Sequence, residues 1–181
     1  MARLVVVSNR VPIPKSRAAT AGGLAVALRD LMTPGSMWFG WSGRLTQDPS
    51  PQPAIVEARG VTYATVDLTA EAYRGFYIGF ANGALWPLLH FRLGLMHFRR
   101  EEYEGYLSVN RTSASSLRPV LQSDDTVWAH DYRLIPFARM LREQGFGGRI
   151  GFFLHVPFVP PSMLEAMPVA RELVADLCAY D

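Results

Sequence analysis

The sequence has almost no cysteine, no long hydrophobic run and little net charge, and each shortage excludes a class of protein. Cys178 is the single cysteine among 181 residues, so an internal disulfide framework is excluded. No apolar run approaches the length that spans a bilayer, and the start of the chain lacks the apolar stretch and cleavage site of a signal peptide. The formal net charge of +2 is too small and too scattered to indicate binding to nucleic acid or to an acidic membrane. These shortages predict a soluble cytoplasmic protein.

The composition predicts one globular domain. The sequence is 49% hydrophobic and 19% charged, which suffices for one well-filled core. The segment TQDPSPQPA (46–54) is polar and rich in proline, which is typical of a loop rather than of a domain boundary. The final segment VARELVADLCAYD (169–181) has the pattern of an amphipathic helix that stops with neither a glycine cap nor a polar tail. This ending indicates a chain cut short.

Strand-like and helix-like segments alternate along the chain. Five short runs, several of them apolar throughout, have the character of buried strands: LVVVS (4–8), MWFGW (37–41), VTYATVDL (61–68), TVWAH (126–130) and RIGFFLH (149–155). Helical spacing joins Leu24, Ala27, Leu28 and Leu31, and again Leu134, Phe137, Ala138 and Leu141. Strands interleaved with helices predict βαβ units, and therefore an α/β fold with a mostly parallel sheet covered on both faces.

A further helix is predicted after the third of these strands. Thr69 is a suitable N-cap, because its hydroxyl can accept a bond from an unpaired backbone N–H of the first turn. Tyr73, Phe76, Tyr77 and Phe80 follow at helical spacing, so we expect them to share one face.

Three predicted strands end in unusual polar residues. Asn9 and Arg10 follow the first strand, His130 and Asp131 follow TVWA, and His155 follows RIGFFL. The carboxyl ends of parallel strands meet at one edge of a sheet, where open α/β sheets bind their ligands, so we expect these residues to converge. On position alone, a helix N-cap is the commoner explanation of Asp131.

The pair Gly22-Gly23 stands at the start of the first helical pattern. Glycines there let a ligand approach the backbone, where free N–H groups and the helix dipole favour a phosphate. A tight turn or close helix packing is the commoner reason for such a pair. The sequence has neither G-x-G-x-x-G nor G-x-x-x-x-G-K-[ST], so ordinary dinucleotide and P-loop sites are not expected.

Several other chemistries lack the spacing that they require. The four histidines and Cys178 show neither H-x-x-x-H nor C-x-x-C, so no zinc site is expected. GWSG (40–43) is not G-x-S-x-G, which argues against a serine hydrolase. Nothing in the spacing nominates the paired carboxylates of a glycoside hydrolase. We therefore predict no metal and no cofactor.

The remaining candidates each have a functional and a purely structural explanation. Arg10 is either a surface arginine or a bidentate partner for a phosphate or carboxylate. Trp41 and Trp86 either pack in the core or offer flat faces and N–H groups to a sugar ring. Tyr77 belongs to an aromatic stripe that favours the core. Asp131 can bond sugar hydroxyls or act as a base, and His155 either bonds the backbone or faces a ligand.

Six motifs in register carry a more specific signal than any of these residues alone. In order, they are LVVVSNRVP, AGGLAVAL, WFGWSG, FANGALWPLLHF, VWAHDYRLIP and IGFFLHVPF. Together they resemble the trehalose-6-phosphate synthases, which are retaining glycosyltransferases of family 20, and the resemblance runs from Leu4 to the last residue. It implies a GT-B architecture of two Rossmann-like domains, each a mostly parallel sheet with helices on both faces. It also implies transfer of glucose from UDP-glucose to glucose 6-phosphate without a metal.

The resemblance implies a role for each candidate residue. Arg10 and Tyr77 would hold the phosphate of glucose 6-phosphate, and Trp41 and Trp86 would line the acceptor pocket. Asp131 would hold sugar hydroxyls near the reacting centre.

On the donor side, Gly22 and Gly23 would approach the diphosphate, and His155 would contact the donor glucose. Asp131 and His155 are thus the candidate catalytic residues, and the resemblance favours a reaction site over a helix cap for Asp131.

The chain departs from the family pattern in three ways. Arg133 stands where a second histidine is common, and Val159 and Ser162 replace a proline and an acidic residue. These changes bear on local loop geometry. The third departure is length, because the matching enzymes continue into a second domain that supplies most nucleotide contacts. We therefore expect residues 1–181 to form the N-terminal, acceptor-side domain without the donor-binding domain, and to be inactive alone.

Two alternatives remain open at this point. A related transferase would use another phosphorylated acceptor, such as glycerol phosphate, or another nucleotide sugar. A non-catalytic module would bind a sugar phosphate or pair with a longer homologue. The sequence also leaves open whether the chain forms a homo-oligomer.

Overall fold

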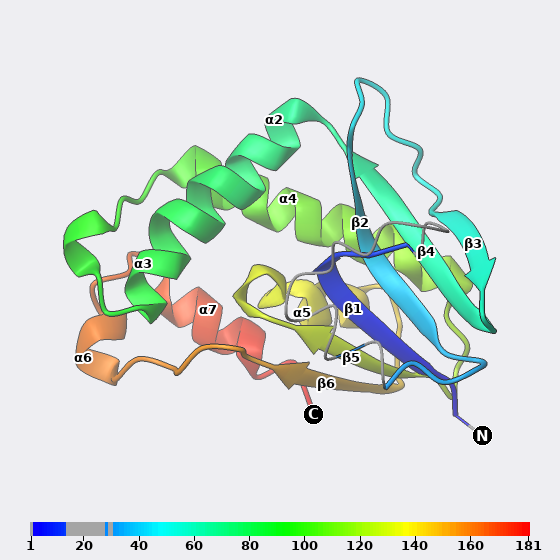
Figure 1. Cartoon of the computed structure of the whole chain (residues 1–181). Coiled ribbons are helices and arrows are strands. Elements are labelled where there is room, and N and C mark those ends of the chain that lie inside the picture. Colours follow the sequence, from blue (N-terminus) through cyan, green and yellow to red (C-terminus); the bar gives the residue numbers. More distant parts are fainter. Residues whose placement is uncertain (1, 14–27, 29–30) are drawn as a thin grey trace.

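A six-stranded sheet with the strand order β3-β4-β2-β1-β5-β6 organises the chain (Figure 1). The computed structural model describes residues 2–13, 28 and 31–181. The strands are β1 (Leu4–Arg10), β2 (Met37–Leu45), β3 (Ala54–Ala58), β4 (Val61–Leu68), β5 (Thr126–His130) and β6 (Arg149–Phe153). All neighbouring strands pair in parallel except β3, which runs antiparallel to β4. The predicted α/β fold with a mostly parallel sheet is confirmed.

All five predicted strands are present, and one strand was not predicted. β3 follows the proline-rich loop directly and lies at the edge of the sheet. Four of its five residues are exposed, so the segment lacks the buried apolar pattern that identifies the other strands. The last predicted strand is also shorter than expected, since β6 ends at Phe153 and leaves His155 in the following turn.

Helical segments connect the strands. In chain order they are α2 (Ala70–Tyr73), η1 (Arg74–Leu85), α3 (Trp86–Leu89), η2 (Leu93–Leu95), α4 (Arg100–Leu117), η3 (Arg118–Val120), η4 (Tyr132–Leu134), α5 (Phe137–Glu143), α6 (Pro161–Leu164) and α7 (Ala170–Leu177). Within the described part of the chain, no helix combines the length and apolar character needed to cross a membrane.

The sheet separates two groups of buried side chains. On one face, Val5, Val7 and Phe39 pack against residues of α4 and α5. On the other face, Val6 and Trp38 pack with Leu28, which is 3% exposed. Most of the predicted helix around Leu28 lies outside the described residues. The alternation of side chains along β1 therefore fills the core on both faces, as expected for an inner parallel strand.

The helical segments α2, η1 and α3 form one continuous stretch from residue 70 to residue 89 (Figure 1). Thr69 caps it as predicted, because its hydroxyl accepts the N–H of Ala72 at 3.0 Å. The twelve residues of η1 have π-helical hydrogen bonding, in which each bond spans five residues rather than four. The wider turn changes which side chains share a face.

The prediction of one shared aromatic face is wrong for this reason. Phe76 and Phe80 are buried against Tyr106 of α4, with ring centroids 5.9 and 4.8 Å from it. Tyr73 and Tyr77 instead stack on each other at 5.1 Å and are only half-buried. The stretch thus has a core face and a separate aromatic face toward the carboxyl edge of the sheet.

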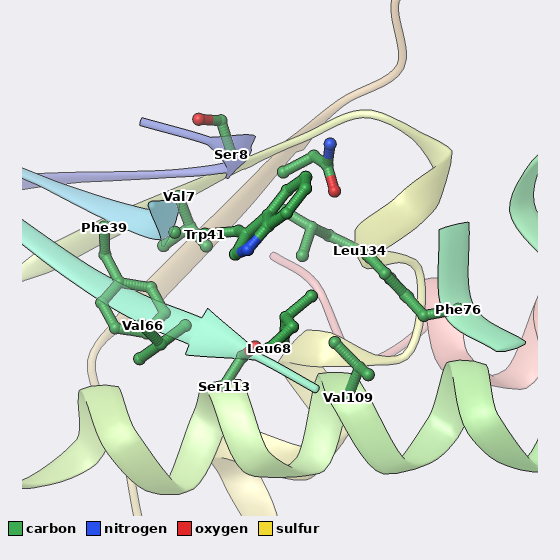
Figure 2. Close-up of a pocket in the computed structure, with 12 residues that line it drawn as sticks. Val7, Ser8, Phe39, Trp41, Val66, Leu68, Phe76, Val109, Ser113 and Leu134 are labelled. Carbon is green, nitrogen blue, oxygen red and sulfur yellow. The ribbon is translucent and has the colours of Figure 1, made fainter. Parts of the chain in front are cut away.

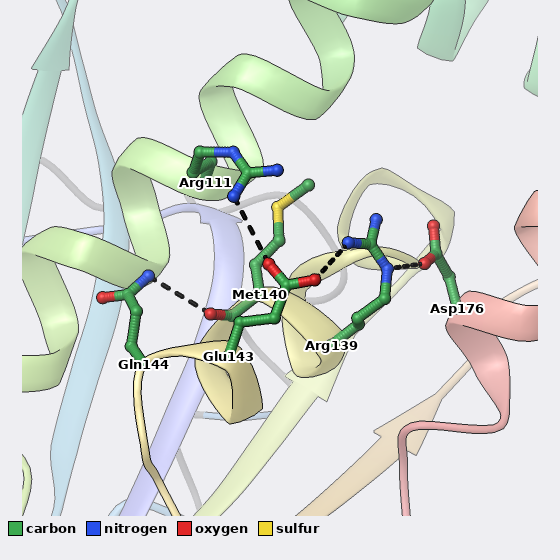
Figure 3. A network of polar contacts seen from close by, with 6 residues as sticks. All are labelled: Arg111, Arg139, Met140, Glu143, Gln144 and Asp176. Carbon is green, nitrogen blue, oxygen red and sulfur yellow. Dashed lines mark hydrogen bonds and ion pairs between the residues drawn. The ribbon is translucent and has the colours of Figure 1, made fainter.

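A network of charged side chains joins three helices (Figure 3). Arg139 of α5 binds both Asp176 of α7 and Glu143 of its own helix, and Arg111 of α4 reaches Glu143 at 3.3 Å. Asp176 is 2% exposed, so its charge depends on Arg139 for compensation. The network fixes α7 against the helices that cover the sheet.

A buried ion pair fixes the start of β1. Arg3 donates from Nε and Nη2 to the two carboxylate oxygens of Asp125, at 3.0 and 2.6 Å. The Asp125 side chain is fully buried and also accepts the backbone N–H of Gln122 at 2.8 Å. This pair ties β1 to the turn before β5, its neighbour in the sheet.

Replacing Asp125 with alanine should strongly destabilise the fold. Asp125→Ala leaves the positive charge of Arg3 without its counter-charge and the Gln122 N–H without its acceptor, and breaking a buried pair in this way costs about 3–5 kcal/mol. Chemical denaturation measures the change in the free energy of unfolding. Arg111→Ala is the control, since it removes an ion pair whose side chains are 59% and 44% exposed and should cost less than about 1 kcal/mol. Equal losses in the two variants would contradict the proposed importance of the buried pair.

Candidate active site

The candidate site lies where the order of the sheet reverses. From β1 the chain first builds β2 and β4 on one side, and later adds β5 and β6 on the other. Ligands of open α/β sheets bind outside the carboxyl ends of the strands at such a point. Arg10 ends β1, Asp131 follows β5, and His155 lies two residues beyond β6, so all three stand at one edge, as predicted. The predicted Gly22 and Gly23 lie outside the described residues.

Arg10 is exposed and is placed by its neighbours on β1 and β2. Trp38 donates its indole N–H to the Ser8 hydroxyl at 2.8 Å, and this hydroxyl lies 3.0 Å from the Arg10 carbonyl oxygen, to which it donates. The Arg10 guanidinium lies over Gly43, where an added Cβ would be 2.7 Å from its Nε and Nη2 atoms. Gly43 has a φ of 90°, which also favours glycine. Spacing alone gave no signal for Gly43.

An aromatic row, formed by Trp41, Tyr73 and Tyr77, extends from Arg10 along the edge. The Arg10 guanidinium carbon is 5.9 Å from the centre of the Trp41 ring. Ring centroids are 5.1 Å apart between Trp41 and Tyr73, and again between Tyr73 and Tyr77. The indole N–H of Trp41 donates to the Arg44 carbonyl oxygen at 2.9 Å, so Trp41 offers its ring face rather than its N–H to a ligand.

Arg133 closes the far end of the aromatic row. Its guanidinium carbon is 4.7 Å from the centre of the Tyr77 ring and 4.6 Å from that of Tyr132. It donates to Asp131 Oδ2 and to Asn82 Oδ1, both at 3.0 Å. Sequence reasoning noted Arg133 only as a departure from a pattern and missed Asn82. Asn82 stands five residues after Tyr77, the spacing that brings residues together on a π-helix but not on an α-helix.

Asp131 does not cap a helix. Its side chain makes no capping hydrogen bond to the turn that follows and instead pairs with Arg133 at 3.0 Å. Its φ of 78° and ψ of 161° lie in a region that glycine occupies almost exclusively, so the backbone is strained at this residue. The Asp131 N–H donates to the Phe153 carbonyl oxygen of β6 at 2.8 Å, which stabilises this backbone conformation. The capping explanation is therefore wrong for this residue.

Helix α4 holds the Asp131–Arg133 turn through two hydrogen bonds. The Tyr106 hydroxyl donates to the Tyr132 carbonyl oxygen at 2.6 Å, and the Asn110 amide donates to the Arg133 carbonyl oxygen at 3.0 Å. Both side chains are fully buried. The turn that carries Asp131 and Arg133 is thus rigidly attached to the core.

Trp86 stands apart from this cluster. It lies at the start of α3, is 38% exposed, and stacks on His90 with ring centroids 4.3 Å apart. None of the contacts found within the described residues joins Trp86 to the aromatic row. Its exposed ring remains free to contact a ligand.

His130 and His155 meet at the ends of β5 and β6. Nδ1 of His130 lies 3.1 Å from Nε2 of His155. His130 is 1% exposed, whereas His155 is exposed. Burial, and to a smaller extent the neighbouring His155, lowers the pKa of His130 from 6.5 to about 4. His130 is therefore neutral near pH 7.

Buried polar atoms without a hydrogen-bond partner concentrate at this edge. In residues 2–13, 28 and 31–181, seven side-chain atoms are in this state, and four of them belong to the candidate site: Asn9 Oδ1, His130 Nε2, Asp131 Oδ1 and Arg133 Nε. Such atoms are costly in a folded protein, and their accumulation at one place marks this edge as a candidate binding site.

A cavity beneath Trp41 is too small to be the substrate site. Figure 2 shows Trp41 and Leu134 on one side of it and Val109 and Ser113 of α4 on the other. The cavity offers about 20 Å³ to the centre of a water-sized molecule, which is room for about one water. This cavity therefore cannot hold a ligand larger than about one water molecule. In the described part of the chain, no three His, Cys, Asp or Glu side chains gather closely enough to hold a metal ion.

Comparisons with known proteins identify the family. The model of glycosyltransferase family 20 matches residues 2–181. The chain is 46% identical over 182 residues to a trehalose-6-phosphate synthase of Cronobacter sakazakii. The alignment covers 100% of this chain and 38% of that protein.

Solved structures of trehalose-6-phosphate synthases have the same fold as this chain. An alpha,alpha-trehalose-phosphate synthase (UDP-forming) from Burkholderia vietnamiensis has a TM-score of 0.94 at 48% identity, over 100% of this chain and 40% of that one. A similar enzyme from Burkholderia xenovorans, in complex with glucose-6-phosphate, has a TM-score of 0.90 at 46% identity, over 99% of this chain and 39% of that one. The chain spans about two fifths of the length of the proteins that it matches.

The low pKa of His130 predicts a pH-dependent part of the stability. Between about pH 4 and pH 6.5 the unfolded chain binds a proton at His130 that the folded chain does not. This stabilisation is complete above pH 6.5 and is lost as the pH falls to about 4, and a shift of this size corresponds to on the order of 3 kcal/mol. His130→Phe should lose correspondingly less stability over this range, as measured by chemical denaturation at each pH. The same pH dependence in both proteins would contradict a buried, neutral His130.

Proposed function

This chain belongs to glycosyltransferase family 20, and from that premise we propose that it forms the acceptor-binding half of a trehalose-6-phosphate synthase. The complete enzyme would transfer glucose from UDP-glucose to glucose 6-phosphate with retention of configuration. Residues 1–181 would be the acceptor-side domain, and a second domain would supply most contacts to the nucleotide. The chain uses no metal or cofactor in this proposal, and it acts in the cytoplasm.

One observation carries the proposal: the cationic Arg10 and the Asp131–Arg133 pair lie at opposite ends of one aromatic row. Among the ion pairs of the described residues none involves Arg10, so its guanidinium is available for a phosphate. A guanidinium binds phosphate through two parallel hydrogen bonds, which fixes the orientation as well as the position of the anion. Glucose 6-phosphate is the ligand of a similar enzyme with the same fold.

Tyr77 and Trp41 of the same row, together with Trp86, would supply the other acceptor contacts. Tyr77 is held between Tyr73 and Arg133, so its hydroxyl has a fixed position from which to donate to the phosphate beside Arg10. Trp41 and Trp86 would line the acceptor pocket with their ring faces, which suit the apolar face of a sugar. The Trp41 ring is held by its hydrogen bond to Arg44, and the Trp86 ring is exposed.

Asp131 would hold the reacting end of the acceptor. Arg133 binds its Oδ2 atom, while Oδ1 is buried without a partner within the described residues, and we propose that Oδ1 accepts a hydrogen bond from a sugar hydroxyl in the complex. Because Arg133 fixes the carboxylate, the hydroxyl is held in one place relative to the donor. Such positioning lowers the barrier by replacing an encounter in solution with a fixed geometry.

On the donor side, we propose that His155 contacts the donor glucose and that Gly22 and Gly23 approach the diphosphate with backbone N–H groups. The leaving diphosphate needs electrostatic stabilisation from fixed donors and cations. Most of these would come from the second domain, so the 181-residue chain holds an acceptor but lacks the groups that release the nucleotide.

The purified chain should therefore show no measurable glucosyl transfer by itself. Activity should appear when a separately produced donor-binding half of a relative is added with UDP-glucose and glucose 6-phosphate, as measured by the formation of trehalose 6-phosphate. Formation of this product by the chain alone would contradict the assignment as an acceptor half. Glycerol phosphate as a better acceptor in the reconstituted assay would instead support the alternative transferase.

Arg10→Ala should weaken glucose 6-phosphate binding to the chain by roughly ten- to a hundredfold, because a hydrogen bond to a charged group contributes about 1.5–3 kcal/mol. Tyr77→Phe keeps the ring in the aromatic row and should have a smaller effect, since its hydroxyl is neutral. Binding is measured by NMR titration, with unphosphorylated glucose as a second ligand whose affinity Arg10→Ala leaves unchanged.

Arg44→Ala is the matched control for Arg10→Ala, because Arg44 is a nearby arginine whose side chain is 79% exposed and lies 3.9 Å from Asp67. It should leave the affinity for glucose 6-phosphate within about twofold of that of the wild type, since exposed ion pairs contribute little. Equal effects of the two substitutions would show that Arg10 acts only through general surface charge.

A further inference from the structure

His130 is the one buried histidine of the candidate site, and none of the roles assigned above uses it. It is the last residue of β5, and its Nδ1 atom faces Nε2 of His155 at 3.1 Å. The two rings lie at 26° with centroids 5.3 Å apart. A hydrogen bond between these nitrogens requires one proton, carried by one of the two rings.

Two arrangements of this proton are compatible with two neutral rings. In the first, His155 donates from Nε2, and the single proton of His130 must then be on its own Nε2. In the second, His130 donates from Nδ1, and the single proton of His155 must then be on its Nδ1. The arrangement chosen by His130 therefore sets which nitrogen of His155 is a donor and which is an acceptor.

The surroundings of His130 favour the second arrangement. Its Nε2 atom is buried without a hydrogen-bond partner in the described residues. The centre of its ring is 4.2 Å from that of Trp128 and 6.2 Å from that of Phe153. In the first arrangement this apolar environment would hold an unpaired N–H group. Unpaired buried N–H groups are rarer in folded proteins than unpaired buried acceptors. The second arrangement leaves only a lone pair there.

We propose that His130 is a positioning residue that donates its Nδ1–H to His155 and thereby fixes the proton of His155 on Nδ1. The consequence for catalysis rests on the proposed function, in which His155 contacts the donor glucose. Nδ1–H, on the nitrogen that does not face His130, then donates to a sugar hydroxyl in a fixed direction. Second residues behind a functional histidine commonly set its tautomer in this way.

The burial of His130 supports this role independently of its position. Burial lowers the pKa of His130 to about 4, so the residue is neutral and holds a single proton over the range in which enzymes usually work. A charged His130 would also carry an N–H on Nε2, which has no hydrogen-bond acceptor among the described residues.

Nitrogen-15 NMR of the 181-residue chain tests the proposal, because long-range proton–nitrogen correlations distinguish the two neutral tautomers. Spectra are recorded near pH 8, above the ordinary pKa range of histidine. His90 is an internal reference, since its Nδ1 lies 2.8 Å from the Trp86 carbonyl oxygen, which can only accept a proton. His155→Gln and the His130 variants assign the two signals of interest.

We expect both His130 and His155 to have the Nδ1–H pattern shown by His90. His130→Asn retains a side-chain N–H close to the position of the original Nδ1, so His155 should keep this pattern. His130→Phe retains a ring without a donor, and His155 should change to the Nε2–H pattern that predominates in free histidine. A substitution that only loosened the structure would not be rescued by asparagine in this specific signal.

An Nε2–H pattern for His155 in the wild-type chain would overturn the proposal, and so would an unchanged Nδ1–H pattern in a folded His130→Phe variant. If His130→Phe does not fold, the tautomer of His155 in the wild-type chain still decides the question. The measurement does not depend on transferase activity, so a failed assay with UDP-glucose would reject the proposed function without affecting this result.

Discussion

The parallel pairing of β1 with β5 is the constraint on which the candidate site depends. These strands are far apart in sequence, and their pairing in register places Arg10, His130 and Asp131 at the same edge of the sheet. The pairing is secured at the opposite end, where Arg3 binds the buried Asp125 just before β5. Because backbone hydrogen bonds fix the register, a shift of one residue would turn His130 to the other face. The positions of Arg10, His130 and Asp131 are therefore set by the sheet.

The second element of the site is the helical stretch from residue 70 to residue 89, and its π-helical middle part determines what it offers to a ligand. One side, with Phe76 and Phe80, is buried on α4, which leaves Tyr73 and Tyr77 for the aromatic row. The same geometry lets Arg133 contact both Tyr77 and Asn82. π-Helical segments are uncommon and often occur at functional sites. Here the helical stretch supplies Tyr73 and Tyr77 to the aromatic surface between Arg10 and Arg133. Arg10 takes part in none of the ion pairs of the described residues.

The sequence predicted the features that depend on local pattern and missed those that depend on approach in space. Five strands and the Thr69 cap were predicted correctly because burial and capping leave periodic or positional signals. β3 left no such signal, since four of its five residues are exposed at the edge of the sheet. Gly43, Asn82 and the stacking of Arg133 depend on neighbours from other elements. Asp131 was ambiguous for the same reason, because a cap and a site residue look alike until Arg133 is placed beside it.

The unpaired polar atoms at the edge of the sheet show how stability and binding oppose each other in this fold. Asp131 has a positive φ. Among the described residues, one carboxylate oxygen of Asp131, one nitrogen of His130 and one nitrogen of Arg133 are buried without a hydrogen-bond partner. Each of these features costs stability in the free chain. Helix α4, through Tyr106 and Asn110, and the hydrogen bond from Asp131 to Phe153 offset that cost by holding the turn rigidly. A flexible turn would let the same atoms find partners within the chain, and the carboxylate would then be lost as a fixed acceptor. The rigidity of the surrounding core therefore holds the carboxylate in a fixed position.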